Sequence, residues 1–185
     1  MPLPQTLNGF IPSVELAREY RKEWENPSNP DYQRYQKITR LFTRSNSALI
    51  DRCDIIYTAY DHFHRQRAAA AVSCIAGIKD FTQRVQNGDL SLIGEMRSYC
   101  GNVFSVMFCH HSCTEKYFGF TNPVREMLVR LNNRDHFYNN AFPTVELQDY
   151  PTFHVVMQQL ISHYHLNNVS NLELDIMLRQ ANMLN

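Results

Sequence analysis

Residues 90–113, LSLIGEMRSYCGNVFSVMFCHHSC, form the most apolar run of the chain. Apolar side chains recur in this run every three or four residues, at Leu92, Ile93, Met96, Tyr99, Cys100, Val103, Phe104, Met107 and Phe108. This spacing is typical of an α-helix that buries a wide apolar face. We therefore predict a buried helix over residues 91–110, with the side chain of Asp89 or Ser91 accepting hydrogen bonds from its first amides.

Two features of this run weigh against a continuous helix. Gly94 and Gly101 each cost about 1 kcal/mol relative to alanine in a helix interior. Residues 103–109 also suit a short buried strand, because periodicity alone does not separate such a strand from part of a buried helix. We favour the helix and place it at the middle of the core.

Helical spacing and helix-start signals continue through most of the chain. Four residues precede such segments as candidate N-caps: Ser13, Asn29, Asn122 and Ser170. Asn29 and Asn122 are followed by proline, which suits the first helical position. These patterns predict an all-α fold, a compact bundle of about seven helices in which the helix over residues 91–110 is central and buried.

The length of 185 residues bounds the domain organisation. A chain of this size forms one medium domain with its own core, or two smaller units that share an interface. We expect a single helical domain over residues 1–185. A subdivision into residues 13–88 and 89–185 is the alternative.

Composition and motifs exclude several classes of function. Lys and Arg number 18, as do Asp and Glu, so the formal net charge is zero, which argues against a dedicated nucleic-acid binder. Glycine-rich phosphate loops and the HExxH zinc motif are absent from the sequence, which argues against nucleotide hydrolysis and dinucleotide redox chemistry. No apolar run reaches the roughly 18 residues that span a bilayer, so we expect a soluble protein.

The cysteines indicate a reducing compartment. Five of them, Cys53, Cys74, Cys100, Cys109 and Cys113, are scattered over helical positions. An odd, dispersed set does not resemble a disulfide framework. Since residues 1–13 also lack the pattern of a secretory signal, we expect free thiols and a cytoplasmic location, or the host cytosol if the protein is a secreted effector.

A cluster of soft ligands ends the apolar run: Cys109, His110, His111 and Cys113. Thiolates and imidazoles bind zinc tetrahedrally, and a thiolate beside a base is also a nucleophile. The cluster is therefore the alternative candidate for a metal site or a catalytic centre. The simpler interpretation is that Cys109 is a core residue and both histidines lie at a helix C-terminus, where the helix dipole favours them.

Two further histidine patterns have weak specificity. Residues 61–64, DHFH, place Asp61 beside His62, as in some metal hydrolases, but a pair this short has little specificity. Surface or boundary histidines are the preferred interpretation. A further hypothesis is a helical bundle that binds haem, but only the presence of histidines supports it. We therefore expect no cofactor.

The one locally basic region of the chain is the predicted helix over residues 31–44. Its cations, continued in the next segment, are Arg34, Lys37, Arg40, Arg44 and Arg52. No acidic residue lies between Asp31 and Asp51. The functional interpretation is a surface for an anionic partner, such as a phosphoinositide head group, RNA or an acidic face of a protein. The alternative is a solvent-facing helix side whose cations pair with acids elsewhere.

These observations favour a non-enzymatic helical module for protein interaction or regulation. Candidate surfaces are the basic helix, the apolar C-terminal helix and the loop over residues 134–150, since long loops are often functional. Frequent Asn and few Gly would suit a lineage-specific bacterial effector or a viral accessory protein. The alternative function is a small Cys/His-dependent or metal-dependent hydrolase that uses the cluster over residues 109–113.

Overall fold

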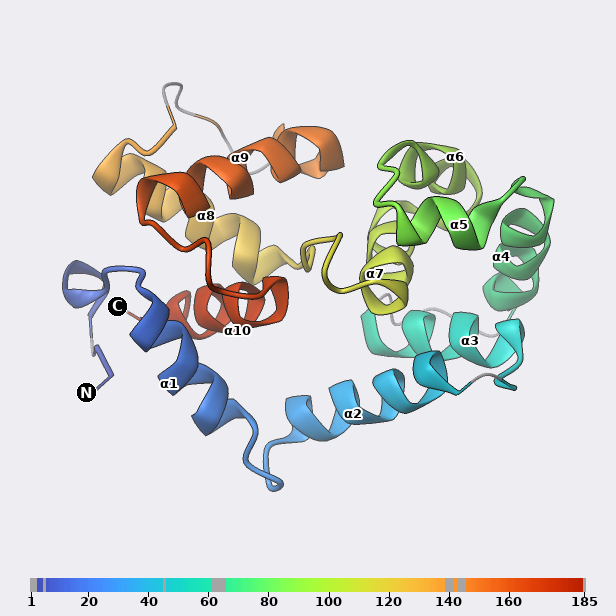
Figure 1. Cartoon of the computed structure of the whole chain (residues 1–185), viewed down its shortest axis with the longest axis horizontal. Helices are drawn as coiled ribbons and strands as arrows, with labels where there is room; N and C mark the ends of the chain where they lie inside the picture. The colour runs from blue at the N-terminus through green and yellow to red at the C-terminus, as the bar shows by residue number, and fades with distance from the viewer. Residues whose placement is uncertain are drawn as a thin grey trace. The chain divides into compact units, whose positions relative to one another are not determined.

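The fold is entirely helical in the part of the chain that the structure describes. The structure is a computed structural model and describes residues 3–4, 6–44, 46–60, 66–138, 142 and 146–184. Within these ranges the chain forms ten α-helices, two short 3-10 helices and no strand (Figure 1). The all-α prediction is confirmed, although about seven helices were expected. None of the described helices is long and apolar enough to cross a bilayer.

The chain divides into two compact units. Residues 27–117 form the central unit, and residues 1–26 together with 118–185 form the terminal unit. This division does not coincide with a boundary between residues 88 and 89, because helices on either side of that position pack together within the central unit.

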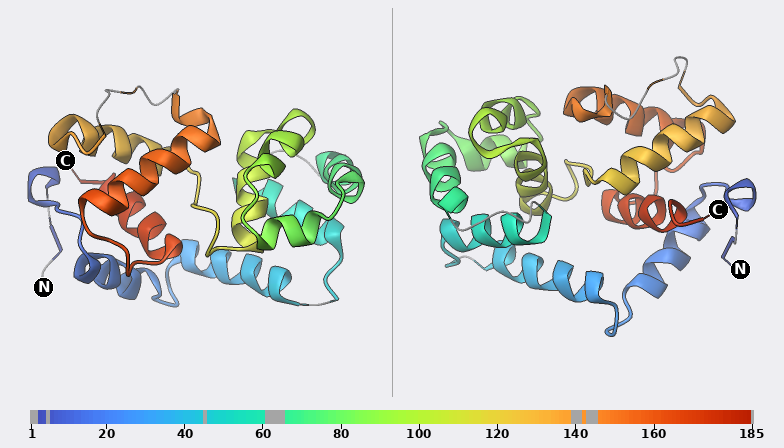
Figure 2. Two further views of the ribbon diagram at one scale, coloured as in Figure 1. Left: turned by 45° about the horizontal axis from the view of Figure 1, so that its top comes forward. Right: turned by 180° about the vertical axis from the view of Figure 1, so that it is seen from behind.

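The described residues of the central unit form six helices in chain order. They are α2 (Pro30–Thr43), α3 (Leu49–Tyr60), α4 (Gln66–Gly77), α5 (Phe81–Gln86), α6 (Ser91–Cys100) and α7 (Asn102–Ser112). Helix α7 packs against α2, α3, α5 and α6 (Figures 1 and 2). Every residue from Phe104 to His111 is buried. The ring of Phe104 lies 4.2 Å from that of Tyr57 and 5.6 Å from that of Phe108, centroid to centroid, so aromatic packing around α7 forms the core of this unit.

The single helix predicted over residues 91–110 is wrong, because the segment forms two helices. Helix α6 ends at Cys100 and α7 begins at Asn102. Between them Gly101 has φ 84° and ψ 157°, a conformation that is open to glycine and strained for other residues. The change of direction leaves Tyr99 76% exposed, although its spacing predicted an inward position. The strand alternative for residues 103–109 is also wrong, since they lie within α7.

The terminal unit is built around α10. Its elements are η1 (Leu7–Gly9), α1 (Val14–Trp24), α8 (Asn122–Asp135), η2 (Glu146–Gln148), α9 (Tyr150–His163) and α10 (Asn171–Ala181). Helix α10 packs against both α1 and α8 (Figure 1) and buries its apolar side chains, among them Leu174, Ile176 and Leu178. The C-terminal helix therefore belongs to the core of this unit rather than to an exposed binding surface.

Local side-chain capping explains several helix starts. The side chains of Ser13, Asn29 and Ser170 accept hydrogen bonds from backbone amides at the starts of α1, α2 and α10, as predicted. Ser170 forms a complete capping box with Glu173, which satisfies two amides that a helix start leaves unpaired. At α8 the cap lies one residue earlier than predicted, at Thr121, and its side chain makes no capping bond.

Candidate functional site

The predicted basic residues share one surface of the central unit. Arg34, Lys37, Arg40 and Arg44 are spaced three, three and four residues apart along and just beyond α2, so they project from one side of the helix. All four are exposed, whereas Ile38 of the same helix is fully buried. We call this surface the basic face: Arg34, Lys37, Arg40 and Arg44, together with Arg52 of α3.

Most of the basic face has no acidic counterpart among the described residues. Arg34 forms an ion pair with Asp31 at 3.6 Å, and both side chains are about half exposed. Lys37, Arg40 and Arg44 have no carboxylate within 4.0 Å in the described ranges. The interpretation that these cations pair with acids elsewhere in the fold is therefore not supported within those ranges.

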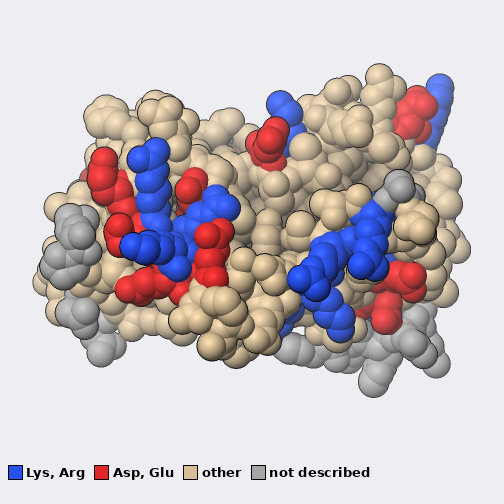
Figure 3. Space-filling model, turned by 60° about the horizontal axis from the view of Figure 1, so that its bottom comes forward, with Lys and Arg blue, Asp and Glu red and all other residues tan. Residues whose placement is uncertain are grey.

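The arrangement of charge distinguishes α2 from α1. Figure 3 shows Lys and Arg side chains gathered in one band over α2 and the start of α3, with acidic side chains only at its edge. The cations of α1 are instead interleaved with acidic side chains. Arg21 of α1, for example, pairs with Glu25 at 2.9 Å and with Glu173 at 3.6 Å. The chain as a whole has zero formal net charge, but on the basic face the positive charges are not balanced by nearby carboxylates in the described part of the chain.

Arg52 connects the basic face to a pocket in the central unit. Its Nη2 donates a hydrogen bond to the carbonyl of Arg44 at 2.9 Å. Its guanidinium carbon lies 5.7 Å from the centroid of the Phe42 ring. Its Nε is buried and has no hydrogen-bond partner, although a buried donor without a partner costs about 1–3 kcal/mol. The pocket that Arg52 lines has a volume of about 710 Å³.

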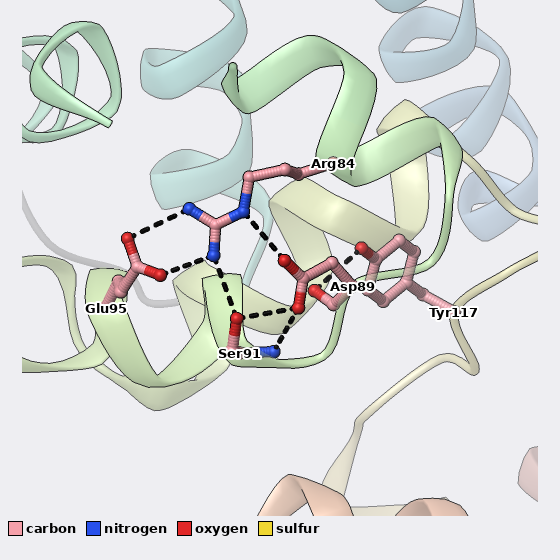
Figure 4. Close-up of polar contacts among 5 residues, drawn as sticks. All are labelled: Arg84, Asp89, Ser91, Glu95 and Tyr117. Atoms are coloured by element: carbon pink, nitrogen blue, oxygen red, sulfur yellow. Dashed lines mark hydrogen bonds and ion pairs between the residues drawn. The ribbon is translucent and has the colours of Figure 1, made fainter. Parts of the chain in front are cut away.

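Helix α5 forms one wall of this pocket and is fixed by an ion-pair network. Arg84 of α5 donates from Nε to Asp89 at 2.7 Å and from Nη2 to Ser91 at 2.8 Å (Figure 4). The same guanidinium pairs with Glu95 of α6. Asp89 also accepts from the amide of Ser91 at 2.9 Å, as predicted for the start of α6. Hydrogen bonds from Ser91, followed by those from Arg84, lower the pKa of Asp89 to about 2.

The two histidines of the predicted cluster point in different directions. His110 is buried, and its Nδ1 lies 2.8 Å from the carbonyl of Tyr117. Because a carbonyl only accepts, Nδ1 carries the proton in this bond. His111 is also buried, and its Nε2 is hydrogen-bonded to the hydroxyl of Tyr60 at 2.8 Å. The rings of Tyr35 and Phe42 lie 5.6 and 5.9 Å from that of His111.

The two cysteines of the cluster differ in burial, and Cys113 lines a small pocket together with His111. Cys109 is fully buried, and burial, with a smaller contribution from Asp89, raises its pKa to about 12. Cys113 ends α7 and is half-buried. In the described part of the chain, no three His, Cys, Asp or Glu side chains are placed to hold a metal ion. The thiol of Cys100 lies near Cys74 and Cys53 instead.

We expect the thiols to differ in reactivity according to burial. Cys109 and Cys53 should react with iodoacetamide about 100-fold more slowly than Cys113 in the native protein, because the thiolate is the reacting species and burial disfavours it. Timed alkylation followed by peptide mass mapping measures each rate. The difference should vanish in guanidinium chloride. Fast native alkylation of Cys109 would support the hydrolase alternative instead.

Two other predicted sites fall partly or wholly outside the described residues. Residues 61–64, with Asp61 and His62, lie outside them. The loop over residues 134–150 is described only in part. Its predicted start is helical instead, because Arg134 lies in the last turn of α8. There Arg134 donates to the carbonyls of Leu7 and Phe10, which fastens the N-terminal segment within the terminal unit.

Comparisons with known proteins provide no assignment. The chain matches no family model, no curated protein and no solved structure.

The pocket beside the basic face was missed by the sequence analysis. Its lining comes from α2, α3, α4, α5 and α7 and from the turn before α5. No local spacing pattern joins positions so far apart in the chain. The one available signal was Arg52, a cation on α3 that continues the basic series of α2.

Proposed function

We propose that this protein is a non-enzymatic interaction module whose central unit binds an acidic segment of a protein partner at the basic face. The observation that carries the proposal is that Lys37, Arg40 and Arg44 are exposed on one side of the chain and have no carboxylate within 4.0 Å among the described residues. A row of cations at helical spacing complements a row of carboxylates. Electrostatic complementarity of this kind gives orientation and a fast association rate.

A protein partner suits this surface better than the other anionic partners considered. RNA binders usually show a clear basic excess, whereas this chain has zero formal net charge. Membrane binding by a helix relies on apolar side chains that enter the lipid beside the cations. The inward side of α2 is instead packed in the fold, since Ile38 is fully buried and the ring of Phe42 lies 5.2 Å from that of Phe108.

The geometry of the Cys/His cluster also favours binding over catalysis. A nucleophilic thiol needs a lowered pKa and a base within hydrogen-bond reach. Burial instead raises the pKa of Cys109, and His110 and His111 are hydrogen-bonded to Tyr117 and Tyr60. We therefore expect no turnover from this cluster.

The test uses a fluorescein-labelled poly-glutamate peptide of about 20 residues as a probe for an acidic segment. The triple substitution K37E/R40E/R44E is expected to weaken binding at least tenfold, about 1.4 kcal/mol. Exposed ion pairs are worth roughly 0.2–1 kcal/mol each, and charge reversal adds repulsion. Fluorescence polarisation at two salt concentrations measures the affinity, which should fall as salt rises.

The matched control, R18E/K22E, reverses two exposed cations of α1 that do not belong to the basic face. It should leave the affinity for the peptide within about twofold of that of the unaltered protein, since an isolated exposed ion pair contributes little. Vesicles containing phosphatidylserine and a uridine oligonucleotide form the comparison arms. Tighter binding of either one than of the peptide would contradict a protein partner. Equal loss in both charge variants would show that the basic face is not the binding surface.

A further inference from the structure

The pocket beside the basic face has the size and lining of a site that receives a side chain or a small ligand. Its volume is about 710 Å³, within the range of about 300–1,000 Å³ found for ligand pockets. Its polar lining includes one cation, Arg52, and one acid, Asp80. Its apolar lining comes from five helices and the turn before α5, with Phe42, Leu49, Ile75, Ile78, Phe81, Val85 and Phe108.

Aromatic rings dominate one part of this lining. The Phe108 ring stands edge-on to Phe42, with centroids 5.2 Å apart, and lies 6.0 Å from the Phe81 ring. Three rings from α2, α5 and α7 therefore meet at the pocket. Aromatic side chains favour tilted and edge-to-face neighbours at such separations, so a further ring entering the pocket would find suitable partners.

Arg52 supplies a binding group for an anion at the same pocket. Its Nη2 is engaged by the carbonyl of Arg44, while its buried Nε has no partner. A guanidinium prefers a planar carboxylate that accepts from Nε and a terminal nitrogen together. The only acid that lines the pocket among the described residues, Asp80, precedes α5 and forms no ion pair with Arg52. A carboxylate from outside would satisfy this donor once the Arg52 side chain turns its buried Nε toward the pocket.

The pocket and the basic face are continuous through Arg52 and Arg44. The hydrogen bond from Arg52 ends on the carbonyl of Arg44, whose side chain is the last exposed cation in the row that follows α2. A chain whose carboxylates lie along the basic face would therefore reach the pocket without leaving the surface. The positive charge of the basic face favours an acidic chain as the occupant. The three aromatic rings of the pocket favour an aromatic residue in that chain.

We infer that this pocket receives an aromatic side chain of the acidic partner segment, with a neighbouring carboxylate of the segment bound by Arg52. The inference rests on the proposed function and adds a specificity to it. The acidic residues provide attraction along α2, and the aromatic residue provides the anchor. Partner recognition then requires acidic residues on both sides of an aromatic residue rather than negative charge alone.

The test compares three acetylated and amidated heptapeptides. The first has phenylalanine between two runs of three glutamates, the second replaces phenylalanine with alanine, and the third replaces every glutamate with lysine. Fluorescence polarisation is expected to show at least tenfold tighter binding of the first peptide than of the second, and no binding of the third. Nitrogen-15 NMR should show a shift of the Arg52 Nε–H resonance with the first peptide.

Two variants test the pocket itself. A76W fills it from an exposed position on α4, and R52Q removes the guanidinium. A76W is expected to abolish the preference for phenylalanine over alanine while leaving glutamate-dependent binding. R52Q, which removes the donor to the neighbouring carboxylate, should weaken binding of the phenylalanine peptide without abolishing that preference. The control A69W alters an exposed position on α4 that does not line the pocket, and it should keep the preference. Circular dichroism confirms folding, and A76W keeps the test decisive if R52Q unfolds.

The binding results distinguish an error about the aromatic anchor from an error about the acidic partner. Equal binding of the phenylalanine and alanine peptides, weakened by K37E/R40E/R44E, would overturn the aromatic anchor and leave the acidic partner in place. Equal binding of the phenylalanine and lysine peptides would overturn both. Binding of benzoate alone as tightly as the first peptide, with the same Arg52 shift, would show a small-molecule site and overturn the peptide anchor.

Discussion

Replacing Phe104 with alanine is expected to destabilise the central unit by about 3–5 kcal/mol, the usual cost of deleting a buried aromatic ring. Phe104 is 1% exposed and lies within α7, which packs against four other helices. Its ring stacks on Tyr57 at 4.2 Å and on Phe108 at 5.6 Å. Alanine would leave a cavity between α3 and α7, and a packed interior relaxes only partly into such a space.

Urea denaturation followed by circular dichroism measures this loss as a lower midpoint. The control is Y99A, because Tyr99 is 76% exposed and its truncation should change stability by less than about 0.5 kcal/mol. A midpoint for F104A as high as that for Y99A would show that the ring of Phe104 is not part of a packed core.

The single tryptophan reports on the other unit in the same experiment. Trp24 is buried in α1 of the terminal unit, whereas circular dichroism follows the helices of both units. If the two units unfold independently, F104A should lower only part of the dichroism transition and leave the fluorescence midpoint of Trp24 unchanged. A parallel fall in both signals would show that the units unfold cooperatively.

Replacing Gly119 with alanine is expected to destabilise the terminal unit by about 1–3 kcal/mol, the cost of inserting a methyl group where no room exists. An added Cβ would lie 2.6 Å from Oδ1 and 2.8 Å from Cγ of Asp175 on α10. Asp175 is 6% exposed, and its Oδ2 accepts a hydrogen bond from Arg179 at 2.9 Å. The carboxylate therefore cannot move aside without losing that bond or displacing α10.

Trp24 fluorescence during urea denaturation measures this change, since α1 packs on α10. A double-mutant cycle isolates its cause. The cost of G119A should be smaller in a D175A background, where the carboxylate that meets the new methyl group is absent. An equal cost in both backgrounds would show that Asp175 is not the obstacle.

The matched control for a glycine replacement is G94A. Gly94 lies in the interior of α6, and no atom lies within 4 Å of an added Cβ. Alanine is the better helix former by about 0.5–1 kcal/mol, so G94A should raise the stability of the central unit. Glycine-to-alanine substitutions at Gly94 and Gly119 are thus expected to have opposite signs, because only Gly119 has a side chain packed against it.

Both predictions depend on side-chain neighbours that the sequence did not identify. Periodicity predicted that Phe104 faces inward, but not that it stacks on Tyr57, which lies 47 residues earlier in the chain. Gly119 lies between α7 and α8, and its neighbour Asp175 comes from the C-terminal helix. Contacts between distant segments depend on how helices dock, and helical spacing specifies only which side of each helix is apolar.

Sequence spacing was also insufficient to predict the contacts of the Cys/His cluster. Adjacent residues on a helix project in different directions, and the structure directs His110 to Tyr117 and His111 to Tyr60. Sequence spacing brought four soft ligands close together along the chain. It did not specify whether their side chains converge on one point, and in the described residues they form no metal site.

The sequence by itself determined the features that arise within one turn or one helix. The all-α class, the caps at Ser13, Asn29 and Ser170 and the alignment of Lys37 with Arg40 on one side of α2 follow from spacing and local hydrogen bonding. Tertiary structure alone decided the two units, the partners of the buried Cys and His side chains and the pocket beside Arg52. These features combine segments that are far apart in the chain, and their geometry is set by the packing of helix against helix.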